Sequence, residues 1–239
     1  MANVSKGSQT NQNDSGGLFY YVFLLLVVLS SVCCTTLHTT DYRKTIANSS
    51  VFKIEVISVE DGAWSGTAWL VQKTDKFSYV MTAGHVCEEG PDVVYSLFSK
   101  DNVESTATRV VLDDDDLDLC LLEVPGNIGN PLAIASKDPE YGDNGFYIGA
   151  PNGIWGNGVA PMYLVHFIGR GTVFGFGNEA LAFSTEGAMG GASGSPIIFN
   201  NQVVALLTLV PPKFQSITSG VPYNSMKSFL ERANRFIQK

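Results

Sequence analysis

Short, mainly apolar runs recur along the chain from residue 49 onward, and turn residues separate them. Runs of this length between turn residues predict β-strands. The clearest runs are Val51–Ile57, Thr67–Val71, Tyr79–Ala83, Arg109–Leu112, Tyr163–Ile168 and Val203–Leu207. Their number and spacing predict an all-β barrel or sandwich.

Only the C-terminal stretch has the hydrophobic period of an amphipathic helix. One face would carry Met226, Phe229, Leu230, Ala233, Phe236 and Ile237. Asn224 or Ser225 is a suitable N-cap, so we expect a helix over 224–238. Its apolar face is expected to pack on the second half of the β-structure, and a membrane or partner helix is the alternative.

Residues 18–34 contain no charged side chain and are about long enough to span a bilayer. They follow a polar tail, 1–17, and precede a linker, 35–48. The length of the apolar run favours an uncleaved anchor over a cleaved signal peptide. We therefore expect a protein anchored to a lipid membrane by one N-terminal pass, or secreted after signal cleavage. Lysine and arginine flank both ends, so the side of the membrane is not predicted.

Composition argues against two classes of protein, those that bind nucleic acids and those that bind metals. The chain has 239 residues and a net charge of -8, and the acidic balance without clustered Lys and Arg argues against nucleic-acid binding. The four cysteines lack the paired spacing of a metal site, so no metal or other cofactor is expected. Cys120 alternates into an apolar strand and is interpreted as a small buried hydrophobic residue.

Three short motifs carry the chemistry. They are Thr82-Ala83-Gly84-His85-Val86, Asp118-Leu119-Cys120-Leu121-Leu122 and Gly191-Ala192-Ser193-Gly194-Ser195-Pro196. A serine hydroxyl is a poor nucleophile unless an imidazole takes its proton and a carboxylate orients that imidazole. Ser193 and His85 are therefore predicted to be nucleophile and base, and the other histidines, His38 and His166, are interpreted as structural.

The glycines around Ser193 have a separate role. Gly191 and Gly194 permit a tight turn that would aim the backbone N–H groups of Gly191 and Ser193 at a developing oxyanion. Taken alone, the Gly-Ala-Ser-Gly-Ser run also fits a flexible surface loop.

The acid has to be chosen among five neighbouring aspartates. Asp113–Asp116 form a run of like charge, which is typical of a solvated turn. Asp118 lies between Leu117 and Leu119 and opens a strand pattern, so it can be partly buried against an imidazole. Asp118 is therefore the predicted acid.

The order His, Asp, Ser resembles the chymotrypsin-like serine proteases, and most of all their HtrA-type and glutamyl endopeptidase branches. Tyr147–Gly153 is similar to the Gly-x-Pro-x-Gly turn that opens their second barrel, and Ser-Gly-Ser-Pro is similar to a glutamyl endopeptidase nucleophile loop. The resemblance covers 49–239 and implies two six-stranded antiparallel β-barrels, over about 49–130 and 140–222, with a C-terminal helix. No PDZ domain is expected.

Two departures from the family pattern stand out. Ala192 occupies the place where an Asp or Asn usually precedes the nucleophile, which leaves the backbone donors in place. Cys87 lies two residues after His85, whereas vertebrate digestive relatives pair the very next residue in a disulfide, so that disulfide is not expected here.

The resemblance also locates the substrate pocket. Its floor corresponds to Gly187, and its wall to the stretch that contains Thr208 and Val210. Without an Asp at the floor or a His on the wall, we expect a small or apolar P1 residue rather than Arg, Lys or Glu. Thr208 is also expected to donate a hydrogen bond to Asp118.

The sequence thus predicts a serine endopeptidase that acts on a protein or peptide substrate through His85, Asp118 and Ser193. One alternative is a catalytically inactive protein that keeps the protease fold as a binding scaffold. Another is a viral or phage maturation protease that cuts itself from its anchor. No oligomeric state is predicted.

Overall fold

The computed structural model describes residues 50–87, 92–172, 179–209 and 216–237, which all belong to one structural unit. The tail, the apolar segment 18–34, His38 and the linker lie outside the described residues, as does Val210. In the part of the chain that is described, no helix has the length and apolar character needed to cross a membrane.

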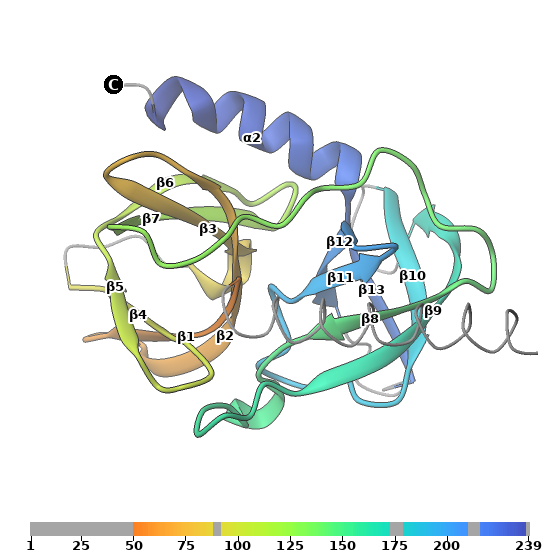
Figure 1. Ribbon diagram of the computed structural model, residues 1–239, viewed down its shortest axis with the longest axis horizontal. Coiled ribbons are helices and arrows are strands. Elements are labelled where there is room, and N and C mark those ends of the chain that lie inside the picture. Colours follow the sequence, from red (N-terminus) through yellow and green to blue (C-terminus); the bar gives the residue numbers. More distant parts are fainter. Residues whose placement is uncertain (1–49, 88–91, 173–178, 210–215, 238–239) are drawn as a thin grey trace, which may run out of the picture. The chain divides into compact units, whose positions relative to one another are not determined.

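Seven antiparallel strands form the first sheet, in the order β5-β4-β1-β2-β3-β7-β6 (Figure 1). The strands are β1 (Val51–Ser58), β2 (Gly62–Lys73), β3 (Phe77–Ala83), β4 (Val94–Phe98), β5 (Glu104–Ala107), β6 (Arg109–Asp114) and β7 (Leu119–Pro125). The apolar runs are buried on both faces of the central strands: Ile54, Trp69, Leu70, Val80, Met81 and Leu121 are fully buried.

The expectation of a six-stranded closed barrel is wrong for this first sheet, which within the described residues has seven strands and runs from β5 to β6 without closing. The additional boundary between strands lies at Thr108. Its backbone N–H and its hydroxyl both donate to the carbonyl of Glu123, at 2.8 and 3.3 Å. The chain changes its neighbour at this residue, since β5 pairs with β4 and β6 pairs with β7. The two strands together thus take the position that a single strand between β4 and β7 would have in a six-stranded barrel.

The second sheet is a closed six-stranded barrel in the order β10-β13-β12-β11-β8-β9, as the resemblance implied. Its strands are β8 (Asn144–Ile148), β9 (Met162–Thr172), β10 (Glu179–Thr185), β11 (Pro196–Phe199), β12 (Gln202–Leu209) and β13 (Ile217–Pro222). Its core contains four aromatic residues, Tyr147, Phe167, Phe183 and Phe199, and the small residues Ala188 and Ala192.

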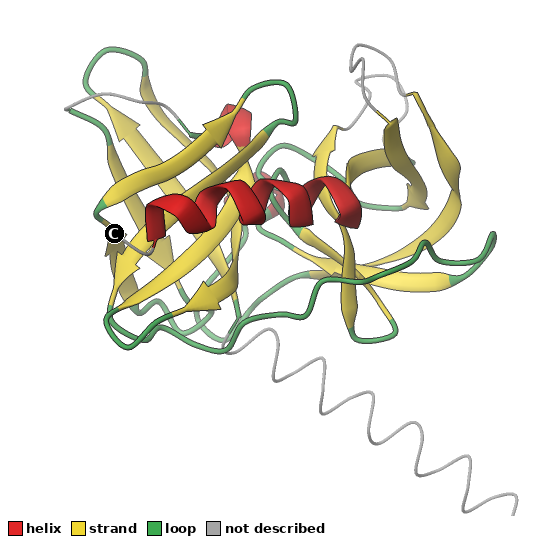
Figure 2. Cartoon of the chain, turned by 90° about the horizontal axis from the view of Figure 1, so that it is seen from above, coloured by secondary structure: helices red, strands yellow, loops and turns green. Residues whose placement is uncertain are grey.

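Helix α2 (Tyr223–Ile237) follows the barrel directly (Figure 2). Met226, Phe229 and Ala233 are buried, whereas Phe236 is 44% exposed. The helix contacts β12 and β13 of the barrel and also β6 and β7 of the first sheet, so it covers more than the second barrel alone.

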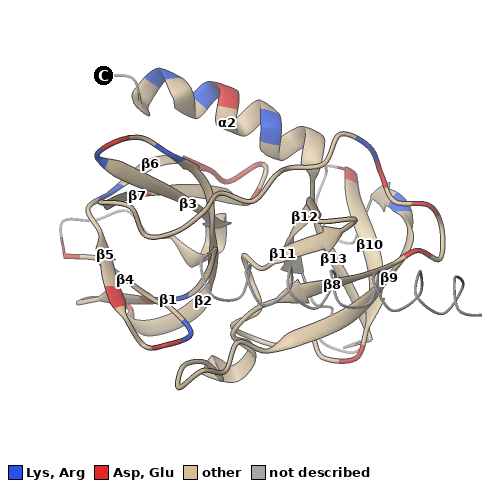
Figure 3. Ribbon diagram, in the orientation of Figure 1, with Lys and Arg blue, Asp and Glu red and all other residues tan. Residues whose placement is uncertain are grey.

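Charge supports this position of the helix. α2 carries mainly basic residues, and the turn between β6 and β7 carries aspartates (Figure 3). Arg232 of α2 forms an ion pair with Asp114 at the end of β6. The all-β class with a C-terminal helix is thus confirmed.

Candidate active site

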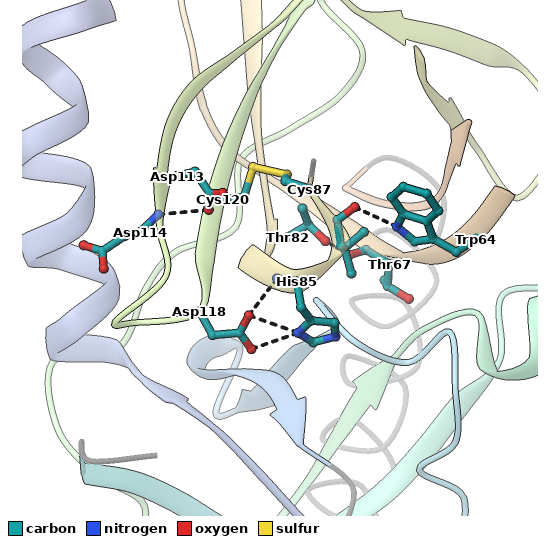
Figure 4. A network of polar contacts seen from close by, with 10 residues as sticks. Trp64, Thr67, Thr82, His85, Cys87, Asp113, Asp114, Asp118 and Cys120 are labelled. Atoms are coloured by element: carbon teal, nitrogen blue, oxygen red, sulfur yellow. Dashed lines mark hydrogen bonds and ion pairs between the residues drawn. A yellow bond between two sulfur atoms is a disulfide. The ribbon is translucent and has the colours of Figure 1, made fainter. Parts of the chain in front are cut away.

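His85 lies on a short 3-10 turn, Gly84–Val86, where β3 ends (Figure 4). The Trp64 indole N–H donates to the Val86 carbonyl at 3.0 Å and holds the turn against β2. The side chain of His85 remains 50% exposed. The turn therefore places the imidazole at the protein surface on a rigid support.

Asp118 stands immediately before β7 and is only 6% exposed. Its carboxylate accepts the backbone N–H of His85 at 2.8 Å, and both carboxylate oxygens lie 3.0 Å from His85 Nδ1 (Figure 4). A carboxylate only accepts hydrogen bonds, so this contact favours the tautomer of a neutral imidazole in which Nδ1 carries the proton and Nε2 has the lone pair. Asp115 and Asp116, in contrast, are exposed.

A disulfide joins Cys87 to Cys120, with 6.4 Å between the two Cα atoms. The interpretation of Cys120 as a small hydrophobic residue was therefore wrong, although the residue is fully buried. Cys120 pairs with Thr82 across β3 and β7, and the turn after β3 returns Cys87 to that strand pair. Sequence spacing held one signal for this link: each cysteine follows a predicted catalytic residue by two positions.

Ser193 lies in the loop between β10 and β11 and is partly exposed. Gly191 and Gly194 adopt positive φ values of 89° and 87°, which side chains rarely tolerate. Ser195, the other serine of the motif, is fully buried, and its hydroxyl has no hydrogen-bond partner among the described residues. Of the two serines, Ser193 is the one that a substrate can reach.

The nucleophile loop meets the His85 turn across β2. The backbone N–H of Thr67 donates to the Ser193 carbonyl at 2.8 Å. A β-carbon added to Gly66 would lie 2.9 Å from the methyl groups of Val86 and 3.2 Å from the same carbonyl oxygen. Ser193 of the second barrel thus lies beside the element that carries His85, and the small residue at position 66 permits this approach.

Of the predicted pocket residues, Gly187 and Thr208 lie among the described residues. Thr208 lines a cavity of about 20 Å³ together with Leu117 and Ser219, and within the described residues it makes no side-chain hydrogen bond to Asp118. The carbonyl of Gly187 accepts the Tyr147 hydroxyl at 2.7 Å.

Tyr163 occupies the space next to Gly187. A β-carbon on Gly187 would lie 2.3 Å from the ring of Tyr163, which stacks on Tyr147 with 5.0 Å between ring centroids. Tyr163 also lines a cavity of about 480 Å³, with Thr185, Glu186 and His166 among its neighbours. These aromatic residues were not expected from the sequence, since alternation predicts a strand but not where its side chains end.

Within the described ranges, no group of three His, Cys, Asp or Glu side chains is placed to hold a metal ion. His166 is exposed on β9, where its Nδ1 contacts the Asn144 side-chain oxygen. It is separate from the His85–Asp118 pair.

Comparisons with known proteins agree with this fold. The active form of the Rv3671c protease from M. tuberculosis is 21% identical, with a TM-score of 0.63 over 76% of this chain and 79% of that one. The serine endoprotease from Yersinia pestis is 17% identical, with a TM-score of 0.64 over 81% and 66%. These likenesses show the fold, and no curated protein matches the sequence. The model of the trypsin-like peptidase domain matches residues 66–206, more than half of the sequence, and the chain therefore belongs to the trypsin-like peptidase family.

Proposed function

We propose that the chain hydrolyses peptide bonds with Ser193 as nucleophile, His85 as general base and Asp118 as the residue that orients His85. The observation that carries the proposal is the contact of His85 Nδ1 with both carboxylate oxygens of Asp118 at 3.0 Å. Family membership supports the serine endopeptidase class.

The reaction proceeds in two stages. His85 Nε2 takes the hydroxyl proton as Ser193 Oγ attacks the substrate carbonyl, and the same proton then passes to the departing amine. This leaves an acyl group on Ser193. Water, activated by His85, attacks the acyl carbon, and the proton returns to Ser193 as the carboxylic acid product leaves.

The backbone N–H groups of Gly191 and Ser193 stabilise the oxyanion of each tetrahedral intermediate. Support comes from the positive φ of Gly191 and from the turn that follows it, in which the Ser195 N–H donates to the Ala192 carbonyl at 3.0 Å. One such donor is worth about 2.7 to 4 kcal/mol of transition-state stabilisation.

A small P1 side chain is the substrate feature we propose. Gly187, the predicted floor, is backed directly by the ring of Tyr163, so this ring would limit the length of a P1 side chain that ends at Gly187. Protein or peptide substrates with a small P1 residue, such as Ala, Ser or Val, fit this arrangement.

We also propose that residues 18–34 tether the enzyme to a membrane. The uncharged sequence of this segment is the support. An anchor predicts that the full chain sediments with membranes after a carbonate wash. Release of a shorter chain into the soluble fraction would instead indicate signal cleavage or self-release from the anchor.

A fluorophosphonate probe tests the catalytic proposal, because it labels only an activated serine. The full chain should label, and Ser193→Ala and His85→Ala should not. Asp118→Asn should lower kcat by about 10⁴-fold, because the amide favours the wrong imidazole tautomer. Ser195→Ala is the matched control: it removes a buried serine hydroxyl of the same motif and should label like the wild type.

An inactive scaffold with the protease fold makes the opposite prediction. Wild-type protein that is folded by circular dichroism and yet resists the probe would favour the scaffold and contradict the catalytic proposal. Equal labelling of Ser193→Ala and the wild type would contradict the assignment of the nucleophile.

A further inference from the structure

Thr67 is a buried residue of the first sheet whose polar groups are all engaged at the nucleophile loop or beside it. Its N–H donates to the Ser193 carbonyl at 2.8 Å, and its hydroxyl donates to the Gly191 carbonyl at 2.9 Å. The same hydroxyl oxygen accepts the N–H of Ala150 at 3.0 Å. The Thr82 hydroxyl donates to the Thr67 carbonyl at 2.7 Å, so Thr67 is itself held in place.

Three consecutive peptide groups of the loop have fixed carbonyls. The Gly190 carbonyl accepts the N–H of Asn152 at 2.6 Å, and the Ala192 carbonyl accepts the N–H of Ser195 at 3.0 Å. Between these two, the Gly191 carbonyl accepts the Thr67 hydroxyl. In a trans peptide the N–H of the next residue points away from the C=O, so the bonds from Asn152 and Ser195 set the directions of the N–H groups of Gly191 and Ser193. The bond from Thr67 fixes the peptide group between them.

The hydroxyl of Thr67 contributes to two of these three carbonyl hydrogen bonds. It binds the middle peptide group directly, and through Ala150 it holds the segment that carries Asn152. That segment forms the 3-10 turn Pro151–Gly153, in which Asn152 has a positive φ of 51°. A single buried hydroxyl of the first sheet therefore restrains the peptide group that joins the two proposed oxyanion donors, and it also restrains the segment whose Asn152 N–H orients the Gly191 donor.

We propose that Thr67 is a positioning residue for the oxyanion hole, acting through its hydroxyl on the Gly191 peptide group and on the Ala150–Asn152 segment. This inference rests on the function proposed above. Thr67 touches no substrate. Its effect is to keep two backbone donors in the geometry that the transition state requires, where a shift of about 1 Å can cost 10²-fold in rate.

Thr67→Val is the informative substitution, because valine has nearly the same shape but no hydroxyl. It would leave the Ala150 N–H and the Gly191 carbonyl without partners in a buried place, and both peptide groups would turn to find others. Thr67→Ser keeps the hydroxyl and should rescue the effect. Should Thr67→Val unfold, Thr67→Cys, which keeps a weak donor, supplies the same comparison.

Ser78→Ala is the matched control. Ser78 is also fully buried, and its hydroxyl also bridges two backbone groups, since it donates to the Gly126 carbonyl at 2.7 Å and accepts the Ile128 N–H at 3.2 Å. It lies on β3 among residues that do not belong to the nucleophile loop. A purely structural loss should therefore appear equally in Ser78→Ala and Thr67→Val.

The experiment measures kcat, KM and thermal unfolding for the full chain with each substitution, on a peptide substrate with a small P1 residue. We expect Thr67→Val to lower kcat by about 10²-fold with KM changed less than about threefold, Thr67→Ser to stay near the wild type, and Ser78→Ala to lose stability but not kcat. An unchanged kcat in folded Thr67→Val, or an equal loss in Ser78→Ala, would overturn the role of Thr67. A folded wild type without turnover or labelling would instead contradict the proposed function.

Discussion

Cys87 and Cys120 are joined by a disulfide, and each lies two residues after one member of the His85–Asp118 pair. The 3-10 turn and the start of β7 are thus joined by two neighbouring links, the His85–Asp118 contact and the disulfide (Figure 4). The disulfide limits how far the turn can move away from Asp118. A covalent link at this place supports the geometry of the pair as well as the fold.

Replacing both cysteines should therefore destabilise the protein and weaken catalysis. The disulfide spans a sequence separation of 33 residues, and closing a loop of this size contributes about 3 to 4 kcal/mol by limiting the unfolded chain. We expect Cys87→Ala/Cys120→Ala to lower the free energy of unfolding by about that amount in a urea titration. We also expect kcat to fall, because His85 loses part of its support.

Dithiothreitol provides the control for this prediction. It should lower the unfolding midpoint and kcat of the wild type and leave the double variant unchanged, even though Cys33 and Cys34 remain in both. If dithiothreitol lowered the midpoint and kcat of both proteins equally, the effect would come from cysteines other than Cys87 and Cys120.

Much of the fold was predictable because short apolar runs between turn residues are typical of buried β-strands. The runs that predicted strands, such as Thr67–Val71, lie within strands of the structure, and the serine endopeptidase class predicted from the three motifs is confirmed by family membership. The split between β5 and β6 was not predictable. It depends on the Glu123 carbonyl reaching Thr108 from a neighbouring strand, and the local pattern around Thr108 contains no trace of that partner.

The same limit applies to the site. Asp118 was separable from its acidic neighbours because leucines flank it, which is a local signal. The Thr67 hydroxyl and the Tyr163 ring act on residues more than twenty positions away, at Gly191 and Gly187. Only the closure of the second barrel against the first sheet brings these residues together, so one sequence without its fold does not reveal them.

The contact between Tyr163 and Gly187 predicts a change of substrate preference. Tyr163→Ala removes the ring that backs Gly187 and should let the site accept larger P1 residues, whereas Tyr163→Phe keeps the ring and the preference. A methylene accommodated in an apolar pocket is worth about 1 to 3 kcal/mol, or 10- to 200-fold in kcat/KM. A peptide library that varies P1 measures the shift.

Tyr141→Ala is the control for this experiment, because Tyr141 is 83% exposed and its loss should leave the P1 profile unchanged. An unaltered profile in Tyr163→Ala would mean that the floor of the pocket lies elsewhere.

The burial of Ala192 accounts for the absence of the Asp or Asn that the family usually has at this position. Ala192 is fully buried and packs in the apolar core of the second barrel. Ala192→Asp would introduce a carboxylate without a partner there, and we expect the free energy of unfolding to fall by about 3 to 5 kcal/mol at pH 7. Ala133→Asp, at an exposed alanine, should cost less than about 0.5 kcal/mol. Equal urea midpoints for the two variants would show that position 192 tolerates charge.

Tyr147 makes stability sensitive to alkaline pH. Burial raises the pKa of its hydroxyl, and the neighbouring Tyr163 raises the pKa further, so the folded chain keeps this proton where the unfolded chain, with a pKa near 10, releases it. Proton release from the unfolded state lowers the free energy of unfolding as the pH rises above about 10.

Tyr147→Phe has no proton to lose, so its stability should fall less steeply than that of the wild type in urea titrations between pH 9 and 11. The lost hydrogen bond to Gly187 adds a constant offset of about 1 kcal/mol. Parallel curves for the two proteins would show that Tyr147 ionises as readily in the folded chain as in the unfolded one, and would contradict the prediction.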